Sequence, residues 1–137
     1  MKNNSAILKL SLLAGSFYFL FVSIAHLFGL KFPGLYIYFQ IPSYAFQDKI
    51  VALFALGWSI FFFTAFTDPV KNITLVRGIL FAGSFAIIIL CFINITTNFY
   101  LFNNSLNTAI IWLETILLFV YWLWLVFFYF LVKKDCI

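Results

Sequence analysis

Charged residues are scarce in this chain of 137 residues, with eight basic and four acidic side chains, or 9% in all. Soluble domains carry about a quarter of their residues as Asp, Glu, Lys and Arg. Apolar residues make up 66% of the chain, and the mean hydropathy is +1.13. No water-soluble fold could bury so much apolar surface, so lipid must form part of the solvent. The length allows one domain, residues 1–137, with about four spans of roughly 20 residues each.

Histidine and cysteine are also scarce, and this excludes several classes of enzyme. The single histidine, His26, cannot ligate haem from both sides, and no His, Cys or carboxylate cluster has metal-ligand spacing. The sequence has no CxxC pair, and Cys91 lies inside an apolar run far from Cys136, so we expect no disulfide. Phosphate-loop, dinucleotide-binding and serine-elbow motifs are missing as well. The sequence therefore predicts no metal and no cofactor, and favours a protein that is not an enzyme.

Four long apolar runs are present, separated by polar or helix-breaking residues. They predict an all-α, integral membrane four-helix bundle with spans at about 10–30, 50–66, 75–97 and 108–132. Asp68 and Pro69 end the second run, because proline removes a backbone donor, and the short turn makes spans two and three neighbours. The segment 32–48 is rich in aromatic, proline and glycine residues. This composition suits a loop that lies along the membrane surface.

The basic residues divide unequally between the two sides of a four-span chain. The side of the termini and the second loop would hold Lys2, Lys9, Lys71, Arg77, Lys133 and Lys134. The other side would hold only Lys31 and Lys49. Because segments rich in Lys and Arg stay in the cytoplasm, we expect both termini to be cytoplasmic. The net charge of +4 then favours attachment to the lipid bilayer through its anionic leaflet, and not binding to nucleic acid.

The first apolar run has a second interpretation, as a cleavable secretory signal. Lys2 and Lys9 precede an apolar stretch that ends in a small-x-small pattern at Ser23 and Ala25. The stretch is long for a signal, so we favour an uncleaved span. The abundance of Phe, Ile, Asn and Lys is typical of an AT-rich genome, which makes a bacterial inner membrane the expected location.

Small residues recur where helices could approach one another closely. Lipid provides no hydrophobic drive between helices, so close packing must come from small side chains. On span three we expect the packing stripe to consist of Gly78, Ala82 and Ala86. Further candidates are Ala14 and Gly15 on span one, and Ala52, Ala55 and Ser59 on one face of span two, with Gly57 on a different face. Cohesion of the bundle is the simplest interpretation, and homodimerisation or a partner-docking groove is the alternative.

Polar side chains inside the spans are the best candidates for function, because each costs about 2 to 3 kcal/mol on insertion scales. Glu114 is the only acid inside a span, and His26 and Asn94 lie about one turn before the ends of spans one and three. The predicted topology places these residues in the outer half of the membrane. We therefore hypothesise a polar pocket open to the outer face and lined by Glu114, His26, Asn94, Gln47, Asp48 and Lys49.

Within this pocket, a Glu114 and His26 pair could exchange a proton near neutral pH. A structural interpretation competes with this one. A single glutamate in a span often serves as a structural group, hydrogen-bonded to Ser, Thr or Asn on a neighbouring helix. A histidine close to the interface is often only a solvated residue at the end of a helix.

Several short motifs resemble the BphX-like and DoxX-like small membrane proteins. The resemblance covers about residues 14–132 and rests on Gly15 and Tyr18, the segment Phe32-Pro33-Gly34-Leu35-Tyr36, the Asp68-Pro69 turn and Leu75-Val76-Arg77-Gly78. Some members of that broad group are associated with oxidoreductase or respiratory partners. The resemblance therefore implies a four-span fold and a membrane location, and it supplies no catalytic residues.

Two functions from different classes remain. The first is a non-enzymatic accessory protein that binds other membrane proteins, or further copies of itself, within a complex. The small size, short loops and small-residue stripe favour this function. The alternative is a small transport or lipophilic-ligand-binding bundle that uses Glu114 and His26. A simple channel is less favoured, because four helices enclose little space.

Overall fold

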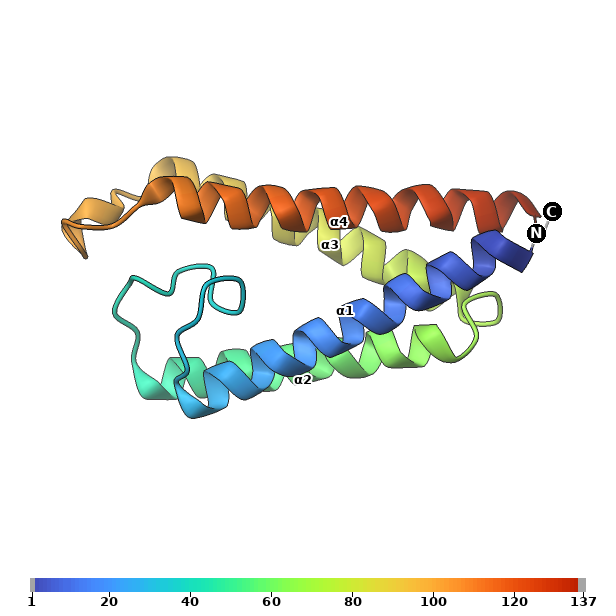
Figure 1. Ribbon diagram of the computed structural model, residues 1–137, viewed down its shortest axis with the longest axis horizontal. Coiled ribbons are helices and arrows are strands. Elements are labelled where there is room, and N and C mark those ends of the chain that lie inside the picture. Colours follow the sequence, from blue (N-terminus) through green and yellow to red (C-terminus); the bar gives the residue numbers. More distant parts are fainter. Residues whose placement is uncertain (1, 136–137) are drawn as a thin grey trace.

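A computed structural model describes residues 2–135, and the chain folds there into four long α-helices and one short 3-10 helix, η1 (Figure 1). No strand occurs in these residues, so the predicted all-α class is confirmed for them. The elements in chain order are α1 (Lys2–Phe28), α2 (Ala45–Thr67), α3 (Ile73–Thr96), η1 (Phe99–Leu101) and α4 (Thr108–Asp135). Each α-helix is long and apolar enough to cross a membrane. Cys136 lies outside the described residues.

The four helices match the four predicted spans, with two differences at their starts. α1 begins eight residues earlier than predicted, at Lys2, and α2 begins five residues earlier, at Ala45. Gln47, Asp48 and Lys49 therefore belong to the first turns of α2 and not to the loop before it. An acidic residue in a first turn is favourable, because the N-terminal end of a helix carries partial positive charge.

Local sequence explains where α1 and α2 end. After α1, Gly29 adopts a left-handed φ of +66°, and the N–H of Leu30 donates to the C=O of Ala25 at 2.8 Å. This arrangement is a Schellman motif, which satisfies carbonyls at a helix C-terminus. After α2, Asp68 is extended, with φ of −152°, because it precedes Pro69. The N–H of Lys71 donates to the Asp68 carboxylate at 3.1 Å, and this bond lowers the pKa of Asp68.

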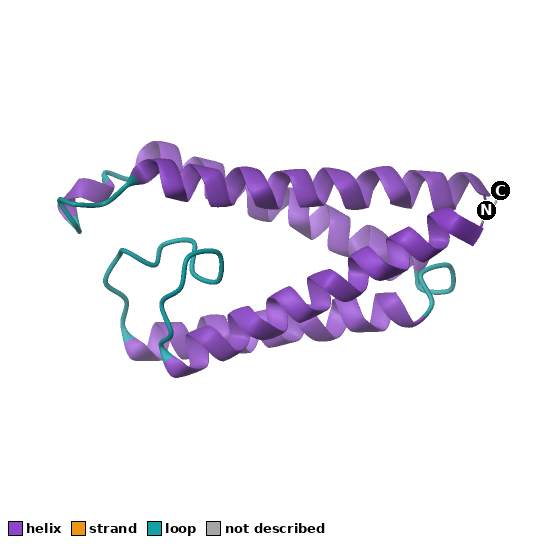
Figure 2. Cartoon of the chain, viewed as in Figure 1, coloured by secondary structure: helices purple, strands orange, loops and turns teal. Residues whose placement is uncertain are grey.

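The helices form two pairs, α1 with α2 and α3 with α4, which converge at one end and diverge at the other (Figure 1). Both termini and the turn at residues 68–72 lie at the convergent end, which we call the termini end. The segments 29–44 and 97–107 lie at the divergent end, which we call the loop end (Figure 2). The Tyr121 hydroxyl of α4 donates to the C=O of Ser11 in α1 at 2.8 Å, and so links the two pairs.

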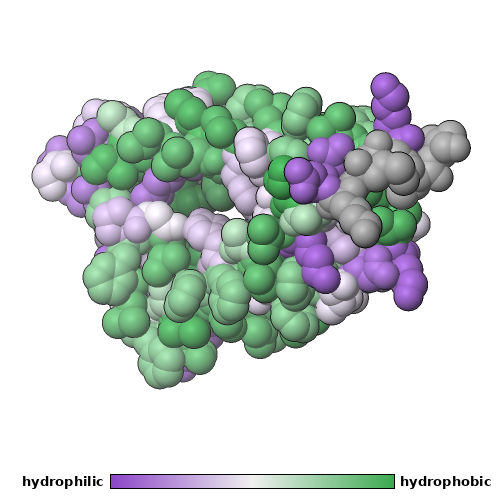
Figure 3. Space-filling model, turned by 45° about the vertical axis from the view of Figure 1, so that its right-hand side comes forward, coloured by the Kyte–Doolittle hydropathy of each residue, from purple (hydrophilic) through white to green (hydrophobic). Residues whose placement is uncertain are grey.

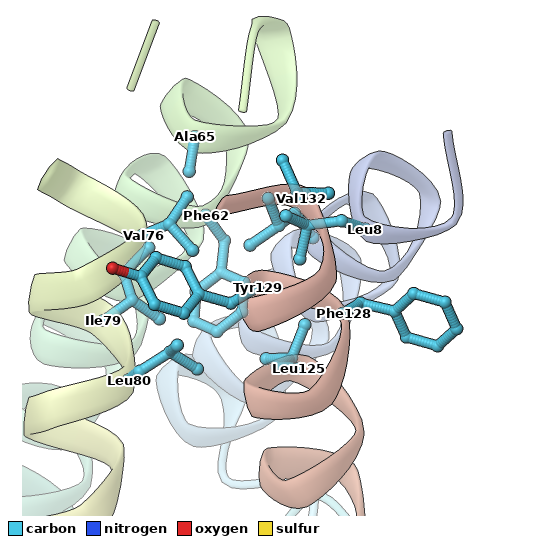
Figure 4. Packing of buried hydrophobic residues seen from close by; sticks show 11 residues of the cluster. Leu8, Phe62, Ala65, Val76, Ile79, Leu80, Leu125, Phe128, Tyr129 and Val132 are labelled. Carbon is cyan, nitrogen blue, oxygen red and sulfur yellow. The ribbon is translucent and has the colours of Figure 1, made fainter. Parts of the chain in front are cut away.

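An apolar core fills the space between all four helices toward the termini end. It consists of eleven buried residues, namely Leu8, Leu12, Phe62, Ala65, Val76, Ile79, Leu80, Leu125, Phe128, Tyr129 and Val132 (Figure 4). Trp122 packs against this core, and its indole N–H donates to the C=O of Leu80 at 2.8 Å. Large apolar side chains therefore occupy the interior at this end.

Serine hydroxyls hold α1 and α2 together along one seam. Ser16 and Ser59 each donate to the other's backbone C=O, at 3.0 and 2.9 Å. One heptad further along α1, and one heptad back along α2, the Ser23 hydroxyl donates to the C=O of Ala52 at 2.8 Å. Ala52, Ala55 and Ser59 are all buried, which confirms their predicted packing role.

Glycine packing differs between α1 and α3. A Cβ atom at Gly15 would overlap the ring of Phe62 and the hydroxyl of Tyr121, so α1 needs a glycine there. On α3 the close approach is at Gly83, where a Cβ would lie 2.9 Å from the Trp122 ring. A Cβ at Gly78 would meet no atom within 4 Å.

The predicted packing stripe is therefore wrong at Gly78, which is exposed together with Ala86, while Ala82 is half-buried. The face of α3 that meets α4 instead contains Gly83, which is one residue further along the helix than Ala82. Gly57, which was expected on a different face from Ala52 and Ala55, also has open space around it.

The sides of the bundle are covered by large apolar side chains (Figure 3). One phenylalanine from each helix illustrates this, because more than half of the surface is exposed at Phe21, Phe54, Phe85 and Phe130. Hydrophilic side chains gather near the ends of the molecule (Figure 3). Such an apolar belt between two polar ends is the surface that a bilayer covers.

The packing at Gly15 generates a stability prediction. We expect Gly15→Ala to lower the free energy of unfolding by about 1–3 kcal/mol, because the methyl group forces Phe62 and Tyr121 to move. Unfolding in mixed detergent, followed by circular dichroism, measures the change. Gly57→Ala is the matched control, since its methyl group enters open space. Equal losses in the two variants would contradict the close approach at Gly15.

Candidate functional site

Residues 29–44, here called the capping loop, fold back between the two helix pairs at the loop end (Figure 2). The prediction that this segment lies along the surface is wrong for its middle part, where residues 35–41 are buried or half-buried and Tyr36 is only 4% exposed. A segment in apolar surroundings needs partners for its polar groups. Each of the four helices supplies one hydrogen-bond partner for the loop. These partners are Tyr18 on α1, Asp48 on α2, Asn94 on α3 and Glu114 on α4.

The tip of the capping loop is a tight turn at Pro33 and Gly34. Gly34 has a left-handed φ of +82°, which glycine adopts without strain, and proline favours the position before it. The Gly34 N–H donates to Glu114 Oε1 at 2.8 Å, and the Gly34 C=O accepts a hydrogen bond from the Tyr18 hydroxyl at 3.0 Å. The backbone of one residue therefore bridges α1 and α4.

Asn94 on α3 connects the capping loop to α4. Its Oδ1 accepts a hydrogen bond from the Tyr38 hydroxyl at 3.0 Å, and its Nδ2 donates to Thr115 Oγ1 at 2.9 Å. Thr115 donates in turn to the C=O of Ile111 at 3.0 Å. Burial raises the pKa of Tyr38 to about 12, so its hydroxyl remains a donor across the physiological range. The contacts of Asn94 fit a structural role.

Gln40 attaches the capping loop to the segment 97–107. Its C=O accepts a hydrogen bond from the side chain of Asn103, and its Oε1 accepts one from the N–H of Asn107, each at 3.0 Å. Apolar side chains reinforce this contact, with Phe99, Leu106 and Ile111 packed against Ile37, Tyr38 and Ile41. The two segments together close the loop end.

A polar cluster forms where the capping loop meets α1 and α2. His26 Nδ1 lies 3.5 Å from Asp48 Oδ1 and is buried without a hydrogen-bond partner, whereas Asp48 Oδ2 accepts a bond from the Ser43 hydroxyl at 2.8 Å. The Tyr36 ring stacks on the imidazole, with centroids 3.6 Å apart. The Tyr36 hydroxyl is buried without a hydrogen-bond partner. Burial and then the nearby Asp48 charge raise the pKa of Tyr36.

A cavity of about 490 Å³, the central cavity, lies between the four helices and the capping loop. Its volume falls within the range of about 300–1,000 Å³ typical of small-molecule sites. Most of its wall is apolar and comes from every helix, including Val22, Val51, Trp58, Ile87, Leu90 and Trp122. His26, Tyr36 and Asp48 contribute polar groups to the same wall. This combination fits a lipophilic molecule with one polar group.

A second cavity of about 340 Å³, the side cavity, lies between α1 and α4. It is lined by Ala14, Gly15, Tyr18, Gly34, Glu114, Leu117, Leu118 and Tyr121. Glu114 is only 8% exposed, and its Oε2 atom is buried without a hydrogen-bond partner. Tyr18, Leu118 and Tyr121 line both cavities and so form the wall between them.

The residues predicted to line one polar pocket lie in separate places. His26, Gln47 and Asp48 border the central cavity, whereas Glu114 borders the side cavity. Lys49 is exposed on α2. Among the described side chains, no hydrogen bond or ion pair joins Glu114 to His26. Glu114 instead accepts a hydrogen bond from Gly34, and His26 lies beside Asp48. Proton exchange within that pair stays a prediction.

Sequence reasoning missed Tyr18, Gly34, Tyr36 and Tyr38 as parts of the site. The tyrosines of the capping loop were assigned to the membrane interface, where such residues are common. A signal was available in the Pro33-Gly34 turn, because a turn leaves a backbone N–H without a helical partner. Glu114 was the one acid predicted to lie inside a span. A buried acid and an unpaired donor tend to meet.

Comparisons with known proteins returned no match, whether among family models, curated proteins or solved structures. The resemblance to BphX-like and DoxX-like proteins therefore stays a prediction.

The Gly34–Glu114 bond generates a prediction about the mobility of the capping loop. Glu114→Ala removes the acceptor of the part-buried Gly34 N–H, and a hydrogen bond to a charged group contributes about 1.5–3 kcal/mol. We expect faster amide exchange at residues 32–38, measured by hydrogen–deuterium exchange mass spectrometry in detergent. Glu114→Gln is the control, because its amide oxygen can still accept the bond. Identical exchange in the Ala and Gln variants would show that the bond does not hold the loop.

The raised pKa of Tyr38 generates a prediction about alkaline stability. The contribution of this hydroxyl is complete below the usual tyrosine pKa of about 10, and it is lost as the pH rises toward the folded value of about 12. We therefore expect the native chain to lose more stability than Tyr38→Phe between these pH values. Detergent unfolding at a series of pH values measures both. Parallel curves would contradict the burial of this hydroxyl.

Proposed function

We propose that this chain is an integral membrane protein that binds a lipophilic small molecule in the central cavity. The observation that carries the proposal is the cavity of about 490 Å³, whose apolar wall is shared by all four helices. A bundle that served only as an accessory subunit would need no cavity of ligand size, so the cavity favours the ligand-binding alternative over the accessory role. The unequal distribution of Lys and Arg supports cytoplasmic termini and an outward loop end. The proposed location, a bacterial inner membrane, rests on the abundance of Phe, Ile, Asn and Lys in the sequence.

The two closed ends favour binding over conduction. The apolar core of eleven residues fills the space toward the termini end, and the capping loop covers the loop end. A water-filled pore would need polar groups along its length. An apolar chamber closed at both ends instead suits a molecule that enters from the bilayer.

The polar cluster indicates which group the ligand carries. The Tyr36 hydroxyl is a buried donor without a partner, and such a group costs free energy until an acceptor reaches it. Tyr36 lines the cavity beside His26 and Asp48. A ligand with an apolar body and a carbonyl oxygen would satisfy this hydroxyl. The proposed class is therefore a carbonyl-bearing lipophile.

Two tryptophans in the wall provide a direct assay. The chain has four tryptophans, and Trp58 and Trp122 line the central cavity, whereas Trp112 and Trp124 are exposed. In a Trp112→Phe/Trp124→Phe background reconstituted in nanodiscs, a bromine-tagged long-chain methyl ketone should quench the fluorescence saturably. The same tagged alkane without the carbonyl should bind more weakly. Quenching that rises only linearly with probe, as in simple partitioning, would contradict a defined site.

The Tyr36 hydroxyl generates a prediction in the same assay. We expect Tyr36→Phe to weaken ketone binding about 2- to 12-fold, which corresponds to the loss of one hydrogen bond. The alkane should bind equally to both proteins, because it makes no bond to the hydroxyl. Tyr100→Phe is the control, since Tyr100 is exposed in η1 and does not line the cavity. Unchanged ketone binding in Tyr36→Phe would place the carbonyl elsewhere.

A further inference from the structure

The side cavity holds a carboxyl group that the fold uses only in part. Glu114 Oε1 accepts the hydrogen bond from Gly34, which anchors the capping loop. Glu114 Oε2 is buried and has no partner, although the side chain is more than nine-tenths buried and borders a cavity of about 340 Å³. One oxygen therefore serves the structure, and the other is free for a ligand.

No basic side chain among the described residues forms an ion pair with Glu114. Among the described side chains, the basic groups found within 4 Å of a carboxylate are His26, beside Asp48, and Lys71, beside Asp68. The remaining wall of the side cavity is apolar apart from the hydroxyls of Tyr18 and Tyr121, and these donate to Gly34 and Ser11. An unpaired carboxylate in such surroundings carries a large desolvation cost.

The geometry points to the side cavity as a binding site for an amphiphilic amine, with its ammonium group against Glu114 Oε2 and its apolar body between α1 and α4. An ammonium group supplies both the hydrogen-bond donor and the positive charge that the carboxylate lacks. A hydroxyl would supply the donor and leave the charge uncompensated. A second carboxylate or a carbonyl would add only another acceptor. The ligand is therefore distinguished by its cationic head.

The shape of the site agrees with this assignment. Ala14 and Gly15 keep the α1 side of the cavity free of bulky side chains except for Tyr18, and Leu117 and Leu118 give it an apolar floor on α4. Leu117 is itself mostly exposed on the outer surface, so the rim of the cavity reaches the face that lipid covers. An amine dissolved in the bilayer can therefore reach Glu114 from the side. The inference does not depend on whether the central cavity is filled.

The test measures binding of radiolabelled decylamine to the full chain in nanodiscs, with empty nanodiscs subtracted. We expect saturable binding of one amine per chain, and a loss of at least about tenfold in affinity in Glu114→Gln, which removes the charge. The glutamine oxygen still accepts the Gly34 bond, so the variant keeps the capping loop in place. Its thermal unfolding, compared with that of the native chain, verifies this.

Asp48→Asn is the matched control, because Asp48 is the other buried acid among the described side chains and borders the central cavity. We expect it to leave amine binding unchanged, and we expect decanol and 2-decanone to compete poorly with decylamine. Amine binding that survives in a folded Glu114→Gln variant overturns the inference. So does decanol or 2-decanone binding as tightly as the amine, or a loss of amine binding in Asp48→Asn alone. Failure of the ketone assay described above affects only the central cavity.

Discussion

The hydrogen bond from Gly34 to Glu114 is the contact on which the loop end of this bundle depends. The two helix pairs diverge there, and the capping loop enters the opening with backbone groups that lie outside any helix and need other partners. Glu114 Oε1 accepts the hydrogen bond from the Gly34 N–H, and the Tyr18 hydroxyl donates to the Gly34 C=O. A single turn thereby anchors the loop that covers the open end of this wedge of helices.

The two cavities follow from where the helices do and do not meet. Toward the termini end, large aliphatic and aromatic side chains fill the interior. Toward the loop end the pairs separate, and only the capping loop and its partners occupy the gap. Space therefore remains in the middle, divided by Tyr18, Leu118 and Tyr121 into a central and a side cavity. Tyr36 and His26 each leave a buried polar atom without a partner on the central-cavity side of this wall, and Glu114 Oε2 is left without one on the other side. The Tyr36 hydroxyl can donate and Glu114 Oε2 can accept, so the cavities differ in the ligand heads they suit.

The sequence predicted the helices well and the site only in part. Runs of apolar residues locate membrane-length helices because lipid leaves the backbone few alternatives, and small residues at Ala52, Ala55 and Ser59 correctly marked the α1–α2 contact. The stripe at Gly78 was misplaced because a shift of a few residues around a helix changes the face, and nearly every face of α3 is apolar. Glu114 was singled out, whereas its partner was missed, because the Pro33-Gly34 turn was the sole sign of a backbone N–H without a helical partner. The inward fold of the capping loop depends on contacts more than fifty residues apart, such as Tyr38 with Asn94.

The serine seam also bears on how the chain is assembled. Ser16, Ser23 and Ser59 find all their partners within α1 and α2, and His26 lies beside Asp48 within the same two helices. These serine hydroxyls can therefore find their partners once α1 and α2 have entered the membrane, before the second half is synthesised. The capping loop must wait, because Gly34 and Tyr38 are bonded to residues that emerge from the ribosome much later, and so must the side of α1 that packs against α4. The capping loop thus reaches its final position only after α4 has been made.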